Sequence, residues 1–360
     1  NSGCSGGPRQ MADITAAALE ASLGDHFGTA VSVSNLHEHV EGWSRDTVSF
    51  RAAWTGGDGD HDRRFVVRAE SDEQIDGDRH DPGNDIETEF RTMAAVQDAA
   101  VPVPETIYWE PDATVLGGRF FVVGHRTGTA PIVWEREDRE RLYAHWDETS
   151  DLPSQFVDAA AGIHELGPAD VPFLDHHGDY VDWEIDRWER IYRESTPRRE
   201  PAVEEAIRWF RANKPEIPEH TLVHGDFRIG NMLVDGEALS AVLDWELARV
   251  GDPMYDLGYA STRYFSGKLI TPIERPELAS SLLEREWFYE EYERRTGRAV
   301  DRDRVRYWRA FSAFVMRTIS LSRVHRFREG RAGDPRSAWL QYTVPGLIED
   351  QLAIVREDRT

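Results

Sequence analysis

Three oxygen-bearing side chains in one stretch of the chain could together act on a phosphorylated substrate. Asp226 follows His224-Gly225, Asn231 comes five positions after Asp226, and Asp244 ends the next apolar run. Apolar segments flank these residues, so the pattern predicts strand, loop, strand, turn and strand. Carboxylate and amide oxygens are ligands that Mg²⁺ prefers when it also holds substrate phosphates. The stretch therefore predicts a phosphoryl-transfer site, with Asp226 facing the substrate and Asn231 and Asp244 as metal ligands.

A predicted β-hairpin must bring these side chains together. Asp235-Gly236 lies between the second and third expected strands, and this dipeptide is typical of a tight hairpin turn. A hairpin there would return Asp244 to the side of Asn231 and of the loop that holds Asp226. The alternative interpretation is structural: Asp226 would be a turn residue, Asn231 a loop cap and Asp244 a strand-end residue.

The motif from His224 to Asn231, followed by Leu243-Asp244-Trp245-Glu246, resembles the aminoglycoside phosphotransferase family, which shares the protein kinase fold. The resemblance implies an α+β fold with two lobes: a small N-terminal lobe built on an antiparallel sheet, and a larger, mainly helical C-terminal lobe. We expect the nucleotide-binding lobe at residues 11–125 and the catalytic and substrate-binding lobe at 126–360. Residues 1–10 are interpreted as an expression-vector remnant that precedes Met11.

The same resemblance implies an activity and its cofactors. ATP and Mg²⁺ are expected, and the γ-phosphate of ATP would move to a hydroxyl group of a small molecule. Asp226 would orient that hydroxyl and take its proton, while Asn231 and Asp244 would hold the metal ion. His224 is expected to support the loop by hydrogen bonding, and Asp256 to brace it.

Two residues of the N-terminal lobe fall where the family holds nucleotide phosphates. Ser44 lies in an expected turn before a strand at 47–50, and an ordinary surface turn is the alternative. Arg68 ends an expected strand at 64–68, at the place where kinases carry a lysine. A guanidinium can bind phosphate bidentately, but with a geometry different from that of an ammonium group.

Two further residues complete the expected nucleotide site. Glu89 lies on a predicted helix over residues 85–99. It resembles the family's helix carboxylate, which pairs with the basic residue on the strand, here Arg68. Glu87 is the alternative for that role. His125 lies in the segment expected to be the hinge, where adenine bonds to the backbone. A histidine at a strand end can also be purely structural.

Hydrophobic periodicity places further elements around these residues. Apolar residues at helical spacing predict helices in the C-terminal half, and β-rich runs predict strands before the hinge. The expected strands are 106–109 and 119–123, and the expected helices are 156–166, 182–192, 202–210, 287–292 and 304–324.

Composition excludes several classes of protein. The chain has 360 residues, of which 40% are hydrophobic and 30% charged, so it is long enough for a sizeable globular core. No apolar run approaches the length of a membrane span, and no leader-like segment opens the chain, so we expect a cytoplasmic protein without a membrane partner. Cys4 is the only cysteine, which excludes an internal disulfide.

The charge balance is strongly acidic. Lysine and arginine number 42 against 66 acidic residues, which gives a net charge of −24, and Lys214 and Lys268 are the only lysines. No segment of the sequence has the clustered lysine and arginine residues that are typical of a nucleic-acid-binding surface. Because salt screens the self-repulsion of such a surface, we hypothesise a halophilic source. A GC-rich genome would explain the preference for arginine but not the excess of acids.

The identity of the phosphate acceptor is open at this stage. An aminoglycoside, and with it a role in antibiotic resistance, is one alternative, because those substrates are polycations that bind acidic pockets. Kinases of amino alcohols such as choline, of homoserine and of methylthioribose share the pattern, as do hydroxyacyl-CoA phosphotransferases. Aromatic residues at 134–192 would suit a less charged acceptor. A nucleotide-binding pseudokinase is the alternative from another class, favoured by the arginine at position 68.

Overall fold

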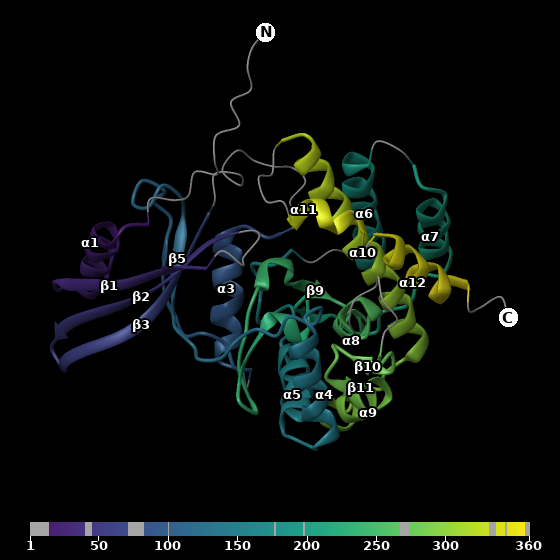
Figure 1. The fold of residues 1–360 in the computed structure, drawn as a ribbon, viewed down its shortest axis with the longest axis horizontal. Coiled ribbons are helices and arrows are strands. Elements are labelled where there is room, and N and C mark those ends of the chain that lie inside the picture. The colour runs from purple at the N-terminus through teal and green to yellow at the C-terminus, as the bar shows by residue number, and fades with distance from the viewer. Residues whose placement is uncertain are drawn as a thin grey trace, which may run out of the picture. The chain divides into compact units, whose positions relative to one another are not determined.

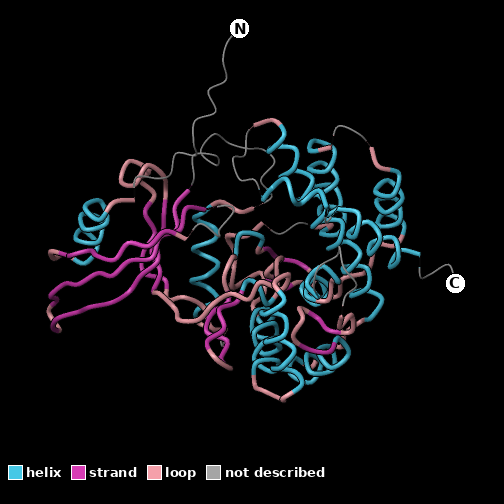
Figure 2. The backbone as a smooth tube through the Cα atoms, viewed as in Figure 1, coloured by secondary structure: helices cyan, strands magenta, loops and turns pink. Residues whose placement is uncertain are grey.

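The computed structural model describes residues 14–39, 45–70, 83–99, 101–175, 178–196, 199–266, 274–330, 336–342 and 344–356 (Figures 1 and 2). These residues fall into two compact units. The first comprises the chain up to residue 98 together with residues 103–126, and the second comprises residues 99–102 and everything from residue 127 onward. Ser44, expected to cover the ATP phosphates, lies outside the described residues.

A five-stranded antiparallel sheet forms the first unit, with the strand order β1-β2-β3-β5-β4. Two helices accompany it: α1 packs on β1, and α3 packs on β4 and β5. The strands are β1 (Val31–Glu38), β2 (Arg45–Gly56), β3 (Gly59–Glu70), β4 (Thr106–Glu110) and β5 (Phe120–Gly124), and the helices are α1 (Ala16–Phe27) and α3 (Ile86–Gln97).

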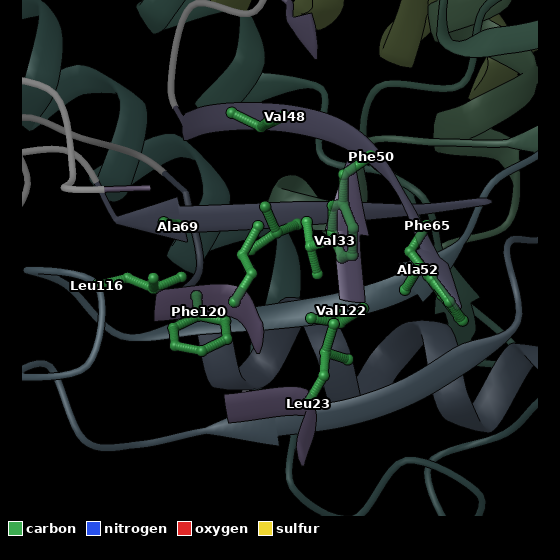
Figure 3. Close-up of a cluster of buried hydrophobic side chains, with 12 residues drawn as sticks. Leu23, Val33, Val48, Phe50, Ala52, Phe65, Ala69, Leu116, Phe120 and Val122 are labelled. Atoms are coloured by element: carbon green, nitrogen blue, oxygen red, sulfur yellow. The ribbon is translucent and has the colours of Figure 1, made fainter. Parts of the chain in front are cut away.

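Alternation along β3 determines which residues enter the core of this unit. Phe65, Val67 and Ala69 are buried, whereas the residues between them are only half-buried. Because successive strand side chains point to opposite faces, Arg68 lies on the other face of the sheet. The buried face contributes to a cluster with residues of α1, β2 and β5, including Leu23, Phe50, Phe120 and Val122 (Figure 3).

Helix α3 covers the sheet face that carries Arg68. The Asp85 side chain caps the helix by accepting the Thr88 N–H at 2.8 Å. The buried side chains of α3 recur at helical spacing: Ile86, Glu89, Thr92, Met93 and Val96. An ionisable side chain therefore occupies the helix face that normally holds apolar residues.

The second unit is mainly helical and is built around the long helix α10, which packs against α6, α8 and α12. Its helices are α4 (Arg136–Asp147), α5 (Leu152–Glu165), α6 (Tyr180–Ser195), α7 (Pro201–Ala212), α8 (Met254–Ala260), α9 (Arg285–Thr296), α10 (Arg302–Arg328), α11 (Arg336–Trp339) and α12 (Val344–Arg356). Its strands pair as β6 (Thr221–Val223) with β9 (Arg249–Gly251), β7 (Met232–Asp235) with β8 (Ala238–Val242), and β10 (Leu278–Ala279) with β11 (Leu283–Glu284). Short 3₁₀ turns are η1 (Ile229–Asn231), η2 (Trp245–Leu247), η3 (Arg263–Ser266) and η4 (Leu340–Tyr342).

The predicted strands and helices are present in the described residues, and most are longer than predicted. Helices α4, α11 and α12 were not predicted. Helix α4 buries only Arg139 and Leu142 and so shows little apolar periodicity. In the described residues, no helix combines the length and apolar character that crossing a membrane requires.

Candidate active site

The hairpin predicted from Asp235-Gly236 is confirmed as β7–β8. Met232 pairs with Val242, and the Leu243 N–H donates to the Asn231 carbonyl at 2.8 Å. Gly236 has φ 60° in the connecting turn, a conformation that glycine adopts without steric cost. Residue 231 at one end of the hairpin therefore lies beside Leu243, the residue that precedes Asp244.

The Asp226 and Asn231 side chains are in direct contact. The Asn231 amide nitrogen donates to Asp226 Oδ2 at 2.7 Å and to the Asp226 carbonyl at 2.9 Å. The 3₁₀ turn η1 makes this possible, because it brings the chain back onto the loop between β6 and β7. With its nitrogen engaged in these two bonds, Asn231 has its carbonyl oxygen left as the atom that can ligate a cation.

Asp244 has an uncommon backbone conformation. It adopts φ 68° and ψ 63°, in the left-handed region that non-glycine residues rarely occupy. His224 Nε2 lies 2.9 Å from the carbonyl oxygen of Leu243 and so helps to fix the adjacent peptide. Strained backbone of this kind costs about 1–3 kcal/mol and is concentrated at functional sites.

The segment from His224 to Asn231, which we call the catalytic loop, rests on the buried carboxylate of Asp256. The backbone N–H groups of His224 and Gly225 donate to its two oxygens at 2.7 and 2.9 Å. His164 Nε2 lies 3.1 Å from the same carboxylate and its Nδ1 lies 2.8 Å from the hydroxyl of Tyr292. The bracing role predicted for Asp256 is thus present, whereas its link to His164 was not predicted.

The pKa of Asp256 reflects this environment. Burial acts to raise the pKa of the carboxyl group, but the hydrogen bond and charge of His164, the charge of His224 and the His224 N–H outweigh burial. The net shift lowers the pKa, so the ionised form is favoured. A buried anion therefore holds the two N–H groups that precede Asp226.

A buried ion pair supports the catalytic loop at Gly225. Arg249 pairs with Glu184, which also accepts the Trp188 indole N–H at 3.0 Å. Gly225 has φ 81°, and a Cβ atom there would collide with the Leu247 carbonyl and the Arg249 guanidinium. Sequence reasoning missed this pair, because its two residues lie far apart in the chain.

Arg228 is a second residue that sequence reasoning missed. Its Nε donates to Asp226 Oδ1 at 3.0 Å, so both Asp226 carboxylate oxygens accept hydrogen bonds from within the catalytic loop. The guanidinium also lies over the Phe265 ring, with Cζ 5.5 Å from the ring centre. The sequence did contain a signal for this contact, because an arginine lies two positions after Asp226 within the motif.

In the first unit, Arg68 and Glu89 form the predicted ion pair. The Glu89 side chain is fully buried, and Arg45 Nε lies 3.4 Å from its other oxygen. Glu87 instead lies 3.8 Å from Arg91 on the exposed side of α3. Glu89, not Glu87, is therefore the carboxylate that pairs with Arg68 of β3.

His125 extends the pairing of β5 with β3, because its N–H donates to the Arg64 carbonyl at 3.0 Å. Partial burial lowers the pKa of its imidazole, and the positive charge of Arg64 adds to the effect. The neutral form is therefore favoured. Of the residues predicted for the site, Arg68, Glu89 and His125 belong to the first unit and Asp226, Asn231 and Asp244 to the second.

The described residues hold no group of three or more His, Cys, Asp or Glu side chains arranged to bind a metal ion. The predicted magnesium ligands do not form such a group, since they are one amide and one carboxylate. This donor set fits Mg²⁺, which is commonly held by one or two carboxylates together with substrate phosphates and water.

An antiparallel sheet with a charged pair between strand and helix, and a mainly helical unit that contains this hairpin, define a protein kinase-like fold. Residues 37–308 match the model of the phosphotransferase enzyme family. The chain belongs to that family.

Curated proteins similar to the chain are acyl-CoA dehydrogenase family members. Member 10 from Mus musculus is 29% identical over 71% of this chain, which corresponds to 23% of that protein. Member 11 from Mus musculus is 25% identical over 95% of this chain and 45% of that protein, and member 11 from Gallus gallus is 32% identical over 50% of this chain and 23% of that protein. The chain thus spans less than half the length of these relatives.

Solved structures share the fold. A Ralstonia eutropha protein assigned to the aminoglycoside phosphotransferases aligns with a TM-score of 0.71 and 22% identity, over 95% of this chain and 98% of that one. Aminoglycoside phosphotransferase APH(4)-Ia, in a complex with ADP and hygromycin B, aligns with a TM-score of 0.56 and 19% identity over 92% of this chain and 98% of that one. Spectinomycin phosphotransferase aligns with a TM-score of 0.56 and 12% identity over 95% of this chain and 98% of that one.

Proposed function

We propose that the chain transfers the γ-phosphoryl group of ATP, used as its magnesium complex, to a hydroxyl group of a small molecule. The observation that carries the proposal is the contact between Asp226 and Asn231 at the end of the hairpin that leads to Asp244. In this arrangement Asp226 would supply the carboxylate for the acceptor, and Asn231 and Asp244 would supply oxygen ligands for a cation. Phosphoryl transfer needs little else from the protein, because positioning and charge neutralisation supply most of the acceleration.

Asp226 would receive the acceptor. Each carboxylate oxygen has two lone pairs, so the bonds from Arg228 and Asn231 leave room for an incoming hydroxyl. Those two bonds fix the rotation of the carboxylate, which orients the hydroxyl before the bond to phosphorus forms. Asp226 would then take the hydroxyl proton.

Asn231 and Asp244 would hold the magnesium ion through the Asn231 carbonyl oxygen and the Asp244 carboxylate. When bound, the ion would neutralise charge on the phosphate oxygens. In the first unit, Arg68 would add positive charge for the nucleotide, held in place by Glu89. The backbone at His125 would complete the proposed nucleotide contacts, together with Ser44, which is proposed from the sequence alone. ATP as donor agrees with a cytoplasmic location.

For the acceptor, a hydroxyacyl thioester is the candidate that the relatives favour. The chain is 25–29% identical to proteins named acyl-CoA dehydrogenase family members over 71–95% of its length. The antibiotic phosphotransferases, at 12–22% identity, share the fold alone. A domain carried by an acyl-CoA dehydrogenase family protein would prepare or consume an acyl-CoA, and a hydroxyacyl-CoA offers the required alcohol.

An acceptor screen tests this function. The purified chain, in buffer with and without high KCl, is incubated with ATP, Mg²⁺ and one acceptor from three classes: aminoglycosides, amino alcohols and hydroxyacyl-CoA thioesters. ADP release and a phosphorylated product, detected by mass spectrometry, are expected with one class and should disappear with EDTA. Nucleotide binding without product from any acceptor would contradict the proposal and favour a pseudokinase.

A further inference from the structure

Arg228 contacts Asp226, the carboxylate to which the proposed function assigns the acceptor. Its Nε is bonded to Asp226 Oδ1 at 3.0 Å, and its side chain is 20% exposed. The two Nη groups make no hydrogen bond to any residue in the described part of the chain. They therefore offer a forked pair of charged donors beside the proposed catalytic carboxylate.

The position of Arg228 is fixed by its neighbours. The guanidinium packs over the Phe265 ring, with Cζ 5.5 Å from the ring centre, a favourable cation–π arrangement. A Cβ atom at Gly230 would collide with Nη1. The absence of a side chain at Gly230 leaves the space that the guanidinium occupies. Packing against Phe265 and Gly230 therefore holds the Arg228 side chain in place.

The ring of Phe265 belongs to a cluster of aromatic side chains. The buried ring of Tyr264 is next to Phe265 and packs against the part-exposed Trp134, with ring centres 5.6 Å apart. Burial raises the pKa of Tyr264; the charge of Arg228 opposes that rise, Asp226 adds to it and Arg323 opposes it. Both guanidiniums are therefore within electrostatic range of this ring.

We propose that Arg228 selects the acceptor by charge: the site takes a hydroxyl compound that carries a carboxylate or phosphate group, and it rejects polycations. This inference rests on the proposed function, since it concerns the acceptor of that reaction. A polyamine acceptor would have to place its ammonium groups near a guanidinium bonded to the catalytic carboxylate, where like charges repel. An anionic group can instead pair bidentately with the Nη fork.

Binding measurements test the inference separately from turnover. The chain loaded with ADP and Mg²⁺ is titrated with 3-hydroxybutyryl-CoA, with free 3-hydroxybutyrate and with kanamycin, using calorimetry. Free 3-hydroxybutyrate is expected to bind more tightly than kanamycin, because its carboxylate is close enough to its hydroxyl for the two groups to meet Arg228 and Asp226 together. The coenzyme A phosphates lie a pantetheine arm away from the hydroxyl of the thioester, so tight binding of the thioester alone would place the anion site away from Arg228 and overturn the inference. Tighter binding of kanamycin, or binding of neither class, would overturn the inference.

Substitutions then assign the selectivity to Arg228. Arg228→Gln should weaken the anionic probe by about tenfold or more, the scale of one lost charged hydrogen bond, and Arg228→Lys should recover part of the loss. The affinity for ATP should stay nearly unchanged, and a rise in the ATP dissociation constant instead would overturn the assignment. Arg294→Gln is the matched control, because that arginine is exposed and pairs only locally with Glu291.

The proposed function can fail independently. If the anionic probe binds, and binding depends on Arg228, but no phosphate is transferred from ATP, then the charge selection holds and the phosphotransferase proposal is wrong. If phosphate is transferred to kanamycin more efficiently than to either anionic probe, then the phosphotransferase proposal holds and the charge selection is wrong.

Discussion

The carboxylate of Asp256 accepts the backbone N–H of Gly225 at 2.9 Å, one residue before the proposed catalytic Asp226. The same carboxylate accepts the His224 N–H, so both oxygens are committed to the catalytic loop. Because the group is buried, each bond is stronger than it would be in water. The position of Asp226 therefore depends on the ionisation state of a fully buried carboxyl group.

Asp256→Asn should show a pH-dependent loss of stability. The pKa of native Asp256 is lowered relative to about 3.9 in an unfolded chain. The ionised group therefore stabilises the native state above that pH, and this contribution is lost as pH falls through the native pKa. The difference in unfolding free energy between wild type and variant, measured with urea between pH 3 and 7, should be largest near neutrality and shrink in acid. A constant difference would contradict the assignment.

Gly225→Ala should damage the catalytic loop more than a matched substitution in the hairpin turn. Both Gly225 and Gly236 have positive φ angles, so each alanine carries a left-handed penalty of about 1–2 kcal/mol. Only at residue 225 does the added Cβ also meet the Leu247 carbonyl and Arg249, whereas nothing lies within 4 Å at residue 236. Thermal unfolding and turnover of the two variants measure the excess cost, and equal losses would show that packing under the loop is unimportant.

Glu89→Gln should destabilise the first unit strongly. The substitution removes a buried carboxylate that two arginines contact, and breaking a buried ion pair in this way costs about 3–5 kcal/mol. ATP affinity should fall as well, because Arg68 loses its anchor. The control is Asp62→Asn, whose partner Arg51 is half-exposed on the same sheet. Exposed pairs contribute about 0–1 kcal/mol, so similar losses from both variants would contradict a structural role for Glu89.

Salt should stabilise the chain. The net charge of −24 makes self-repulsion a cost of the compact state, and the screening length falls from about 10 Å at 0.1 M to about 3 Å at 1 M salt. The thermal unfolding midpoint should therefore rise as KCl is added, whereas an uncharged osmolyte at equal osmolality should give a smaller increase. An unchanged midpoint and full activity without salt would remove the halophilic hypothesis.

Local signals in the sequence predicted the elements that carry the site. The Asp235-Gly236 turn, the alternation around Arg68 and the helical spacing around Glu89 each involve neighbouring residues, and the structure contains the hairpin, the strand and the helix they indicated. The bracing by Asp256 was predicted from the family pattern and is also present.

Long-range partners could not be predicted in the same way. The pair of Arg249 and Glu184 joins β9 to α6, and the contact of His164 with Asp256 joins α5 to α8. No periodicity links residues so far apart in the chain, because such contacts follow from packing of whole elements. The left-handed backbone of Asp244 was equally hidden, since a non-glycine residue gives no signal for that conformation.

The direct test of the account is phosphoryl transfer by Asp226→Asn, measured in single turnover with γ-labelled ATP, Mg²⁺ and the acceptor identified by the screen. Asparagine keeps the size of the side chain but cannot take the hydroxyl proton, so the rate should fall by about 10²–10⁴-fold while ATP affinity and folding stay nearly unchanged. Asp235→Asn, at the exposed hairpin turn where Asp235 bonds to Thr127, should transfer phosphate at close to the wild-type rate. Transfer by Asp226→Asn at the wild-type rate would contradict the central claim that Asp226 is the group that activates the acceptor.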